Sequence, residues 1–129
     1  MNKDYELSNT FFNKADAFIE ENKKDIGGKI LGTLLNPESE IYLGEDFEKV
    51  AIHYYKALNY TFLNKYDEAL VEAKRINLQL QKIGEKYPAD KKGRYTTDAF
   101  SLNLQGMLYE ASGSVNDAFI SYRNAVDLY

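Results

Sequence analysis

Cysteine and tryptophan are absent from this 129-residue chain, and histidine occurs once, at position 53. Without cysteine the chain can form neither a disulfide framework nor a thiolate metal site. A single imidazole, that of His53, excludes a metal site built from several histidines. The sequence also contains no apolar run of about 18 residues, the length that crosses a membrane as one helix. These absences exclude a disulfide-rich fold, a thiolate or multi-histidine metal site and a single membrane-spanning helix within this sequence. They leave a helical or mixed domain with an ordinary core.

The charge balance gives no sign of a nucleic-acid partner. Sixteen Lys and Arg residues stand against twenty Asp and Glu residues, so the formal net charge is −4. Nucleic-acid-binding domains usually carry a basic patch or stripe, and the one local basic cluster here is Lys91, Lys92 and Arg94. We interpret this cluster as a solvated loop and not as a phosphate site.

The first third of the chain predicts one helix and a long connector. Apolar residues recur at three- and four-residue steps over residues 4–24, as one face of a helix requires. Gly27 and Gly28 then supply a helix stop. Residues 26–43 form a connector in which a short apolar run predicts one helical turn. No cofactor is expected, because neither a phosphate loop nor a dinucleotide fingerprint is present.

The remainder of the chain predicts two pairs of helices. The first pair covers residues 44–63 and 66–83, with a break at Asn64 and a stop at Gly84. A polar loop covers residues 85–94. The second pair begins with Thr96 or Thr97 as the N-cap residue, pauses at Ser112 and Gly113, and restarts at Ser114. Ser114 and Asp117 have the spacing of a capping box. We find no convincing strand pattern.

The two helix pairs share an order of residues. Each pair contains a small residue and, three positions later, a tyrosine. A turn residue stands four positions after the tyrosine, and an alanine stands five positions after the turn residue. In the first pair these are Ala57, Tyr60, Asn64 and Ala69, and in the second they are Gly106, Tyr109, Gly113 and Ala118. Small residues at these places allow two helices of a hairpin to cross closely, while the tyrosines fill the space between hairpins.

This order resembles the tetratricopeptide repeat (TPR) family. The resemblance implies an all-α fold, an α-α superhelix of about two and a half TPR-like helical hairpins with long insertions. It divides a single domain, residues 1–129, into a half repeat at about 4–25, the connector 26–43, a repeat at 44–84, the loop 85–94 and a repeat at 95–129. The opening helix matches the second helix of a repeat, with Tyr5 and Ser8 in the places of Tyr66 and Ala69. Its first helix would precede Met1, so the chain is expected to be cut within a repeat.

A narrower resemblance covers most of the chain from Asp4 onward. The run at 42–48, the run at 53–60 and the run at 109–113 are similar to an uncharacterised bacterial TPR family of exported lipoprotein type. That resemblance implies a periplasmic or cell-envelope location, the alternative being the cytoplasm. The signal and lipid-attachment cysteine of such proteins are not in this sequence.

Neither His53 nor the acidic cluster of Glu45, Asp46 and Glu48 predicts a catalytic or metal site. The carboxylates complement the positive end of a helix dipole at its first turn, which is the interpretation we favour. His53 is interpreted as a packed side chain, since no Ser-His-Asp arrangement is evident in the sequence.

The expected function is non-enzymatic: a scaffold that binds a protein or peptide through the concave face lined by the first helices of the hairpins. The candidate groove residues are Tyr54, Tyr55, Lys56, Asn59, Asn103 and Gln105. Packing of these tyrosines against the connector 26–43 stays open as an alternative. Exposed repeat ends also predict self-association.

Two other classes of function stay open. The first is a small-molecule-binding domain of a bacterial envelope protein, which requires a closed aromatic pocket near Tyr54, Tyr55 and His53. The second is a hydrolase that pairs His53 with Ser101 or Ser112 in a cleft.

Overall fold

The computed structural model describes residues 4–23, 44–86 and 97–128, and all of its regular elements are helices. They are α1 (Tyr5–Lys23), α3 (Asp46–Phe62), α4 (Tyr66–Lys86), α5 (Ala99–Ala111) and α6 (Val115–Val126). The predicted all-α class is therefore confirmed for the described residues. The connector 26–43, with its predicted helical turn, and the loop 85–94 apart from its first two residues lie outside them.

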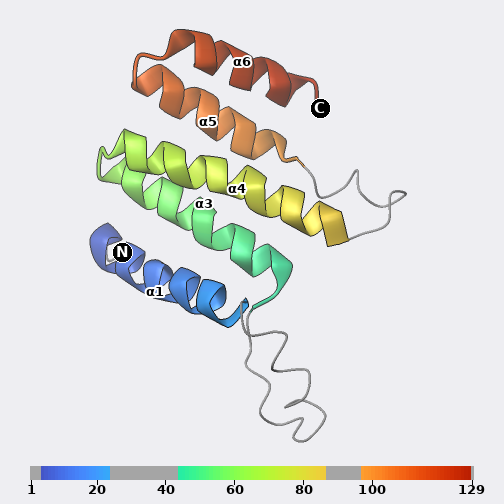
Figure 1. Ribbon diagram of the computed structural model, residues 1–129. Coiled ribbons are helices and arrows are strands. Elements are labelled where there is room, and N and C mark those ends of the chain that lie inside the picture. The colour runs from blue at the N-terminus through green and yellow to red at the C-terminus, as the bar shows by residue number, and fades with distance from the viewer. Residues whose placement is uncertain (1–3, 24–43, 87–96, 129) are drawn as a thin grey trace, which may run out of the picture.

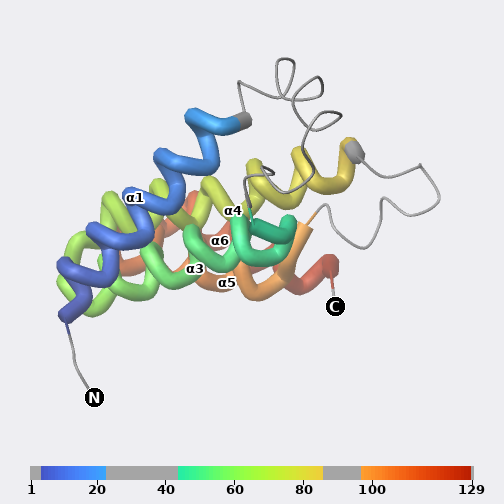
Figure 2. Tube along the Cα trace, turned by 90° about the horizontal axis from the view of Figure 1, so that it is seen from below, coloured from blue at the N-terminus to red at the C-terminus, as the bar shows by residue number. Residues whose placement is uncertain are grey.

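The helices form a stack that follows the order of the chain (Figure 1). Each helix packs against the next, from α1 at one end to α6 at the other. Seen from below the stack, α1 and α4 lie on one side and α3 and α5 on the other (Figure 2). Helix α3 is consequently covered by α1 on one flank and by α4 on another, which decides which of its side chains stay accessible.

The hairpin turns α3–α4 and α5–α6 have the same geometry, as the repeated residue order predicts. Asn64 and Gly113 both adopt positive φ angles, 57° and 80°. Each turn is closed by the same pair of backbone bonds, for example Lys65 N to Tyr60 O at 2.9 Å and Ser114 N to Tyr109 O at 2.8 Å. Glycine and asparagine tolerate this left-handed conformation better than other residues, so the two turn residues are explained by the turn.

Two predicted helix ends and one predicted capping box are wrong. The N-cap of α5 is Asp98 and not a threonine, because the Asp98 carboxylate accepts a hydrogen bond from Ser101 N at 2.9 Å. The Ser114 side chain makes no capping bond, so the predicted capping box is absent. Helix α4 continues through Gly84 to Lys86. Glycine only weakens a helix, by about 1 kcal/mol, and burial of the adjacent Ile83 outweighs that cost.

Two apolar clusters hold the stack together. The first joins both hairpins: Ala57, Ala69 and Ala73 pack with Leu104 and Leu108 of α5. The second lies between α3 and α4 and consists of Val50, Ile76 and Ile83. The small residues predicted to mark close helix crossings, Ala57, Ala69, Gly106 and Ala118, are all buried.

Candidate functional site

Two of the predicted groove residues are interior residues. Only 2% of Lys56 and 7% of Gln105 is exposed. The Lys56 ammonium contacts Glu72 Oε1 at 2.9 Å, and Gln105 Nε2 donates to Ser101 Oγ at 3.3 Å. They therefore line no accessible groove. Helices α1 and α4 cover the α3 face that bears Lys56, and α4 covers the α5 face that bears Gln105.

Tyr55 and Asn59 face α1 instead of a partner. The Tyr55 ring stacks on Phe12 with a centroid separation of 5.8 Å. Asn59 Nδ2 donates to Ser8 Oγ and to Asn9 Oδ1, both at 2.9 Å. These two predicted groove residues thus join α1 to α3, although Tyr55 remains largely exposed.

Tyr54 marks the junction of α3 and α5. Its hydroxyl donates to Asp98 Oδ2, and its ring lies 5.7 Å from that of Phe100 between centroids. Burial, the hydrogen bond with Asp98 and the negative charge of that carboxylate raise the pKa of Tyr54 far above its ordinary value. Asn103 of α5 is half-buried. Tyr54 of α3 is thus a predicted groove residue that does lie where the first helices α3 and α5 meet.

The surface that the structure forms here consists of Phe47, Tyr54, Phe100 and Met107, which we call the α3–α5 face. Phe47, Phe100 and Met107 are 71%, 54% and 60% exposed. Seven-residue spacing puts Phe47 on the Tyr54 side of α3 and Met107 on the Phe100 side of α5. The seven-residue spacing is visible in the sequence and predicts that the two residues of each pair share one face of their helix. It does not predict that this face stays uncovered when the helices stack.

A hollow of about 520 Å³ adjoins this face. It is lined by Glu45, Asp46, Phe47, Val50, Ala51, Tyr54, Leu80 and Ile83. The helix lengths explain it. Ser101, in the first turn of α5, bonds Asn77 of α4 at 3.0 Å, so α5 does not extend along the later turns of α4 that carry Leu80 and Ile83. Apolar side chains of α3 and α4 therefore border a space that no third described helix fills.

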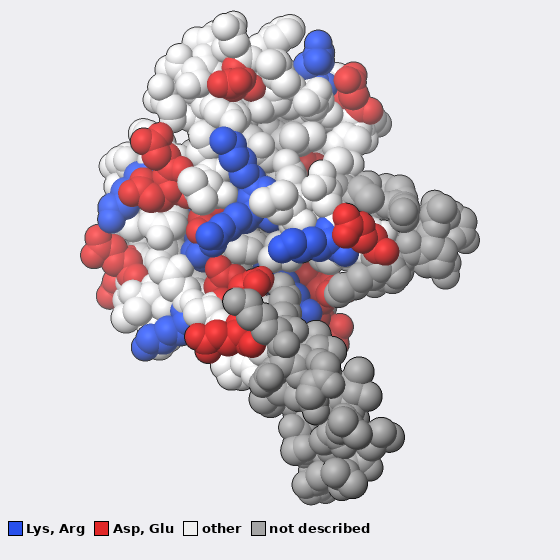
Figure 3. Space-filling model, viewed as in Figure 1, with Lys and Arg blue, Asp and Glu red and all other residues white. Residues whose placement is uncertain are grey.

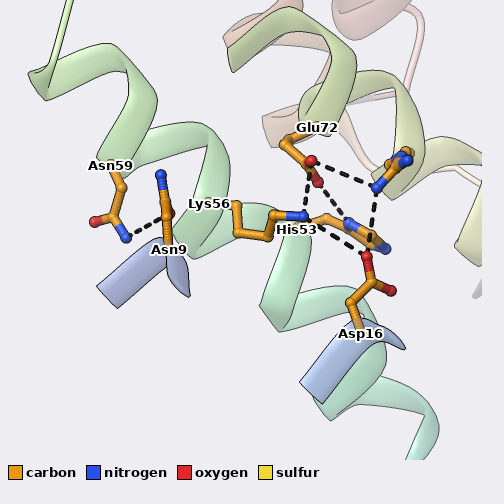
Figure 4. Close-up of polar contacts among 7 residues, drawn as sticks. Asn9, Asp16, His53, Lys56, Asn59 and Glu72 are labelled. Carbon is orange, nitrogen blue, oxygen red and sulfur yellow. Dashed lines mark hydrogen bonds and ion pairs between the residues drawn. The ribbon is translucent and has the colours of Figure 1, made fainter. Parts of the chain in front are cut away.

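A buried charge cluster ties α1, α3 and α4 together (Figure 4). His53 Nδ1 lies 2.8 Å from Glu72 Oε2, and the Lys56 ammonium lies between Glu72 and Asp16. Arg75 approaches Asp16 at 3.4 Å and Glu72 at 3.5 Å. His53 and Glu72 are 2% and 5% exposed. The charges of this cluster pair with one another, and the Arg75 and Asp16 side chains, 46% and 21% exposed, form its edge toward solvent. Groups that pair within the stack in this way offer little to a ligand.

Acid is expected to destabilise the fold through Glu72. Burial alone raises the pKa of this carboxyl, but the hydrogen bonds with His53 and Lys56 and the charges of Lys56 and Arg75 outweigh burial and hold the pKa below its usual 4.5. The unfolded chain therefore binds this proton more readily. The Glu72 contribution to stability is present above that value and is lost as pH falls through the lower folded pKa.

Urea unfolding between about pH 3 and pH 6 measures this effect. We expect the free energy of unfolding to fall more steeply with acidification in the parent chain than in Glu72→Gln. Equal slopes would show that other carboxylates account for the acid sensitivity.

A hydrolase would need a hydrogen bond between His53 and Ser101 or Ser112. The hydrogen bonds of the described residues include no such pairing. His53 bonds Glu72, the Ser101 hydroxyl donates to Asn77 Oδ1 at 3.0 Å, and the Ser112 hydroxyl donates to Leu108 O at 2.8 Å. Ser101 is fully buried. These contacts do not place a histidine beside a serine in a cleft, which is the geometry that the hydrolase hypothesis requires.

The acidic residues at the start of α3 support the helix end. Glu48 Oε2 accepts a bond from Glu45 N at 2.8 Å, and Asp46 lies 3.6 Å from the Lys49 ammonium. Over the part of the chain that the structure describes, no group of three or more His, Asp or Glu side chains is arranged to hold a metal ion. The basic cluster at 91–94 lies outside that part.

Comparison of the chain with protein-family models, with curated proteins and with solved structures gave no match. Among the described helices, none has both the length and the apolar character needed to cross a membrane.

Proposed function

We propose that this chain is a non-enzymatic interaction module of TPR-like hairpins that binds a protein or peptide partner through the α3–α5 face. In this arrangement α3–α4 and α5–α6 are successive repeats, and α1 is the second helix of the repeat before them. The matching hairpin turns at Asn64 and Gly113 support the repeat assignment. The first helices, α3 and α5, then present the binding face.

The apolar hollow beside Phe47 is the observation that carries this proposal. Its volume of about 520 Å³ is enough for a large apolar side chain, and the exposed rings of Phe47 and Phe100 extend the contact along the stack. Buried aromatic and aliphatic anchors supply most of the free energy of binding in protein interfaces. Glu45 and Asp46 at the same hollow favour a peptide with lysine or arginine next to its apolar anchor.

Selection of peptides from a displayed library, followed by fluorescence anisotropy, tests the proposal. We expect enriched peptides to combine a bulky apolar residue with a basic one and to bind in the micromolar range. Phe47→Ala, which removes an exposed contact, and Ala51→Phe, which fills the hollow, should each raise Kd at least about tenfold, equivalent to about 1.4 kcal/mol.

Leu78→Ala is the matched control, because Leu78 is 55% exposed on α4 and does not line the hollow. Its Kd should match that of the parent chain. The proposal fails if no peptide is enriched over an unrelated helical protein. It also fails if the Phe47 and Ala51 variants bind the selected peptides as tightly as the parent does.

A small-molecule function is the second candidate, and the same hollow favours it. Small-molecule sites are clefts of roughly 300–1,000 Å³ with mostly apolar walls, and this hollow lies within that range. A compound of this kind would raise the melting temperature of the parent chain and leave that of Ala51→Phe unchanged. Peptide enrichment without any such compound would favour the leading proposal.

A further inference from the structure

Helix α1 is attached to the stack with little burial of apolar side chains. Among its side chains that the structure describes, only Asn9 and Ile19 are buried, with 5% and 9% exposed. Neither of the two apolar clusters of the described core contains an α1 residue. Leu7, Phe11 and Phe18 remain 48%, 61% and 46% exposed. Apolar burial therefore contributes less to attaching α1 than to joining α3, α4 and α5.

Polar contacts join α1 to α3 and α4 instead (Figure 4). Asn59 Nδ2 of α3 donates to Asn9 Oδ1 at 2.9 Å. Asp16 lies 3.6 Å from the Lys56 ammonium of α3 and 3.4 Å from Arg75 Nη1 of α4. Asn9 Nδ2, in contrast, is buried without a hydrogen-bond partner among the described residues. A buried donor without a partner costs free energy that water recovers when the contact opens.

Two ring contacts complete the attachment of α1, and a hollow lies beside them. Tyr5 stacks on Phe62 with centroids 4.9 Å apart, and Phe12 stacks on Tyr55 with centroids 5.8 Å apart. A hollow of about 350 Å³ lies between the second half of α1 and the first half of α3. It is lined by Phe12, Ala15, Phe18, Ile19, Gly44, Glu48, Ala51, Ile52 and Tyr55. The close packing that stabilises protein interiors is thus incomplete between these two helices.

We call Tyr55, Lys56, Asn59, Phe62 and Arg75 the α1-binding surface. It includes three of the predicted groove residues, Tyr55, Lys56 and Asn59. Its two cations, Lys56 and Arg75, also contact Glu72, so removal of Asp16 leaves two cations beside one carboxylate. The surface therefore favours a helix that supplies a negative charge, as α1 does. Figure 3 shows acidic and basic side chains close together over α1, α3 and α4 on the face viewed, and fewer over α5 and α6.

A helix attached in this way opens more easily than the rest of the stack. Segments with few buried apolar contacts open locally, at free energies below that of global unfolding. Release of α1 leaves both apolar clusters complete, because neither contains an α1 residue. It also leaves Lys56 paired with Glu72 at 2.9 Å. The remaining helices therefore keep the contacts that hold them together.

We propose that α1 is a displaceable helix. It opens as one unit while α3, α4, α5 and α6 stay folded, and the free α1-binding surface then takes the α1 helix of a second copy. The structure shows that this helix fits, because an incoming Asp16 meets the same Lys56 and Arg75. Exchange of an identical element between chains needs no new contacts. The α1-binding surface is separate from the α3–α5 face and does not depend on the proposed function.

Hydrogen exchange of the full chain, followed by mass spectrometry, tests the opening of α1. Amides of residues 9–20 should share one opening constant, at least about a hundredfold larger than that of α4. Asp16→Asn should raise this constant at least about tenfold, because it removes the carboxylate between Lys56 and Arg75. Glu21→Gln is the matched control, since Glu21 is exposed on the same helix, and it should leave the constant unchanged.

Gly106→Ala separates opening of α1 from global unfolding. A Cβ atom at position 106 would lie 2.4 Å from a ring atom of Tyr122, so this change weakens the contact between α5 and α6. It should raise the opening constant of α6 at least about fivefold. The opening constant of α1 should stay the same, because the contact between α5 and α6 persists when α1 alone opens.

A fluorescein-labelled peptide of residues 4–23 tests the exchange of α1 between chains. It is titrated with the full chain, and binding is followed by fluorescence anisotropy. Because the α1 helix of the chain competes for the same surface, the Asp16→Asn chain should bind the peptide at least about tenfold more tightly than the parent chain. A peptide that itself carries Asp16→Asn should bind at least about tenfold more weakly, and a scrambled peptide should not bind.

Three results would overturn this inference. The first is a Gly106→Ala effect on α1 as large as that on α6, because α1 would then open only with the whole chain. The second is a gradual increase of exchange from residue 20 toward residue 5, which indicates fraying of a helix end. The third is a peptide affinity that is the same for the parent and Asp16→Asn chains, or no binding to either, because the peptide would then not replace α1.

Discussion

Replacing Glu72 with glutamine is expected to lower the free energy of unfolding by about 3 kcal/mol. The substitution keeps a partner for His53 but removes the carboxylate 2.9 Å from the Lys56 ammonium, which is 2% exposed. A buried charge that loses its partner typically costs about 3–5 kcal/mol. We expect the lower end, because Asp16 remains 3.6 Å from the same ammonium. Urea unfolding monitored by circular dichroism measures the difference.

The Lys56→Met/Glu72→Gln double variant tests whether the loss comes from the unpaired charge. Removing both charges should cost clearly less than the sum of the two single changes, because no unpaired lysine remains. Lys65→Met is the matched control. Lys65 and Glu6 are 4.0 Å apart with side chains 47% and 73% exposed, so its effect should stay within about 0.5 kcal/mol. Strict additivity of the Lys56 and Glu72 changes would contradict the interpretation.

Gly106→Ala is expected to destabilise the chain by about 1–3 kcal/mol, although alanine favours helices. A Cβ atom at position 106 would lie 2.4 Å and 2.5 Å from two ring atoms of Tyr122. The Tyr122 hydroxyl also donates to Glu110 at 2.8 Å, so moving the ring breaks a hydrogen bond. The overlap outweighs the roughly 1 kcal/mol by which alanine exceeds glycine in helix propensity.

The same substitution in a Tyr122→Ala background should change sign. With the ring removed, Gly106→Ala should stabilise the chain by up to about 1 kcal/mol through helix propensity. The equivalent pair in the other hairpin is Ala57 and Ala73, both fully buried, which shows that two alanines fit at this crossing. A Gly106→Ala effect that is the same in both backgrounds would show that the contact does not determine the cost.

Helix content and the hairpin turns could be predicted from local residues. Apolar spacing specified α1, α3, α4 and α6, and Asn64 and Gly113 marked turns that both take positive φ angles. These features depend on interactions within a few residues, which a sequence displays directly. Helix ends were less predictable, since Asp98 caps α5 in place of the expected threonine and burial of Ile83 carries α4 past Gly84.

The candidate site was predicted less well than the fold. Tyr54 lies at the α3–α5 junction, but Lys56 and Gln105 are buried, and Tyr55 and Asn59 join α1 to α3. The sequence showed that these residues occupy first helices. It did not show that Asp16, 40 residues before Lys56, would approach the ammonium from a third helix.

The sequence by itself determined where the helices form, where the hairpins turn and which small residues lie at their crossings, because these follow from local spacing and backbone preference. Only the tertiary structure decided which polar residues are buried as partners of one another and which apolar ones remain exposed. That outcome depends on how far each helix extends beside its neighbours. The start of α5 beside Asn77 leaves the hollow at Leu80 and Ile83. Among the described helices α5 packs extensively against α6, on the side of Ala118 and Ala125, and Phe119 and Val126 remain exposed.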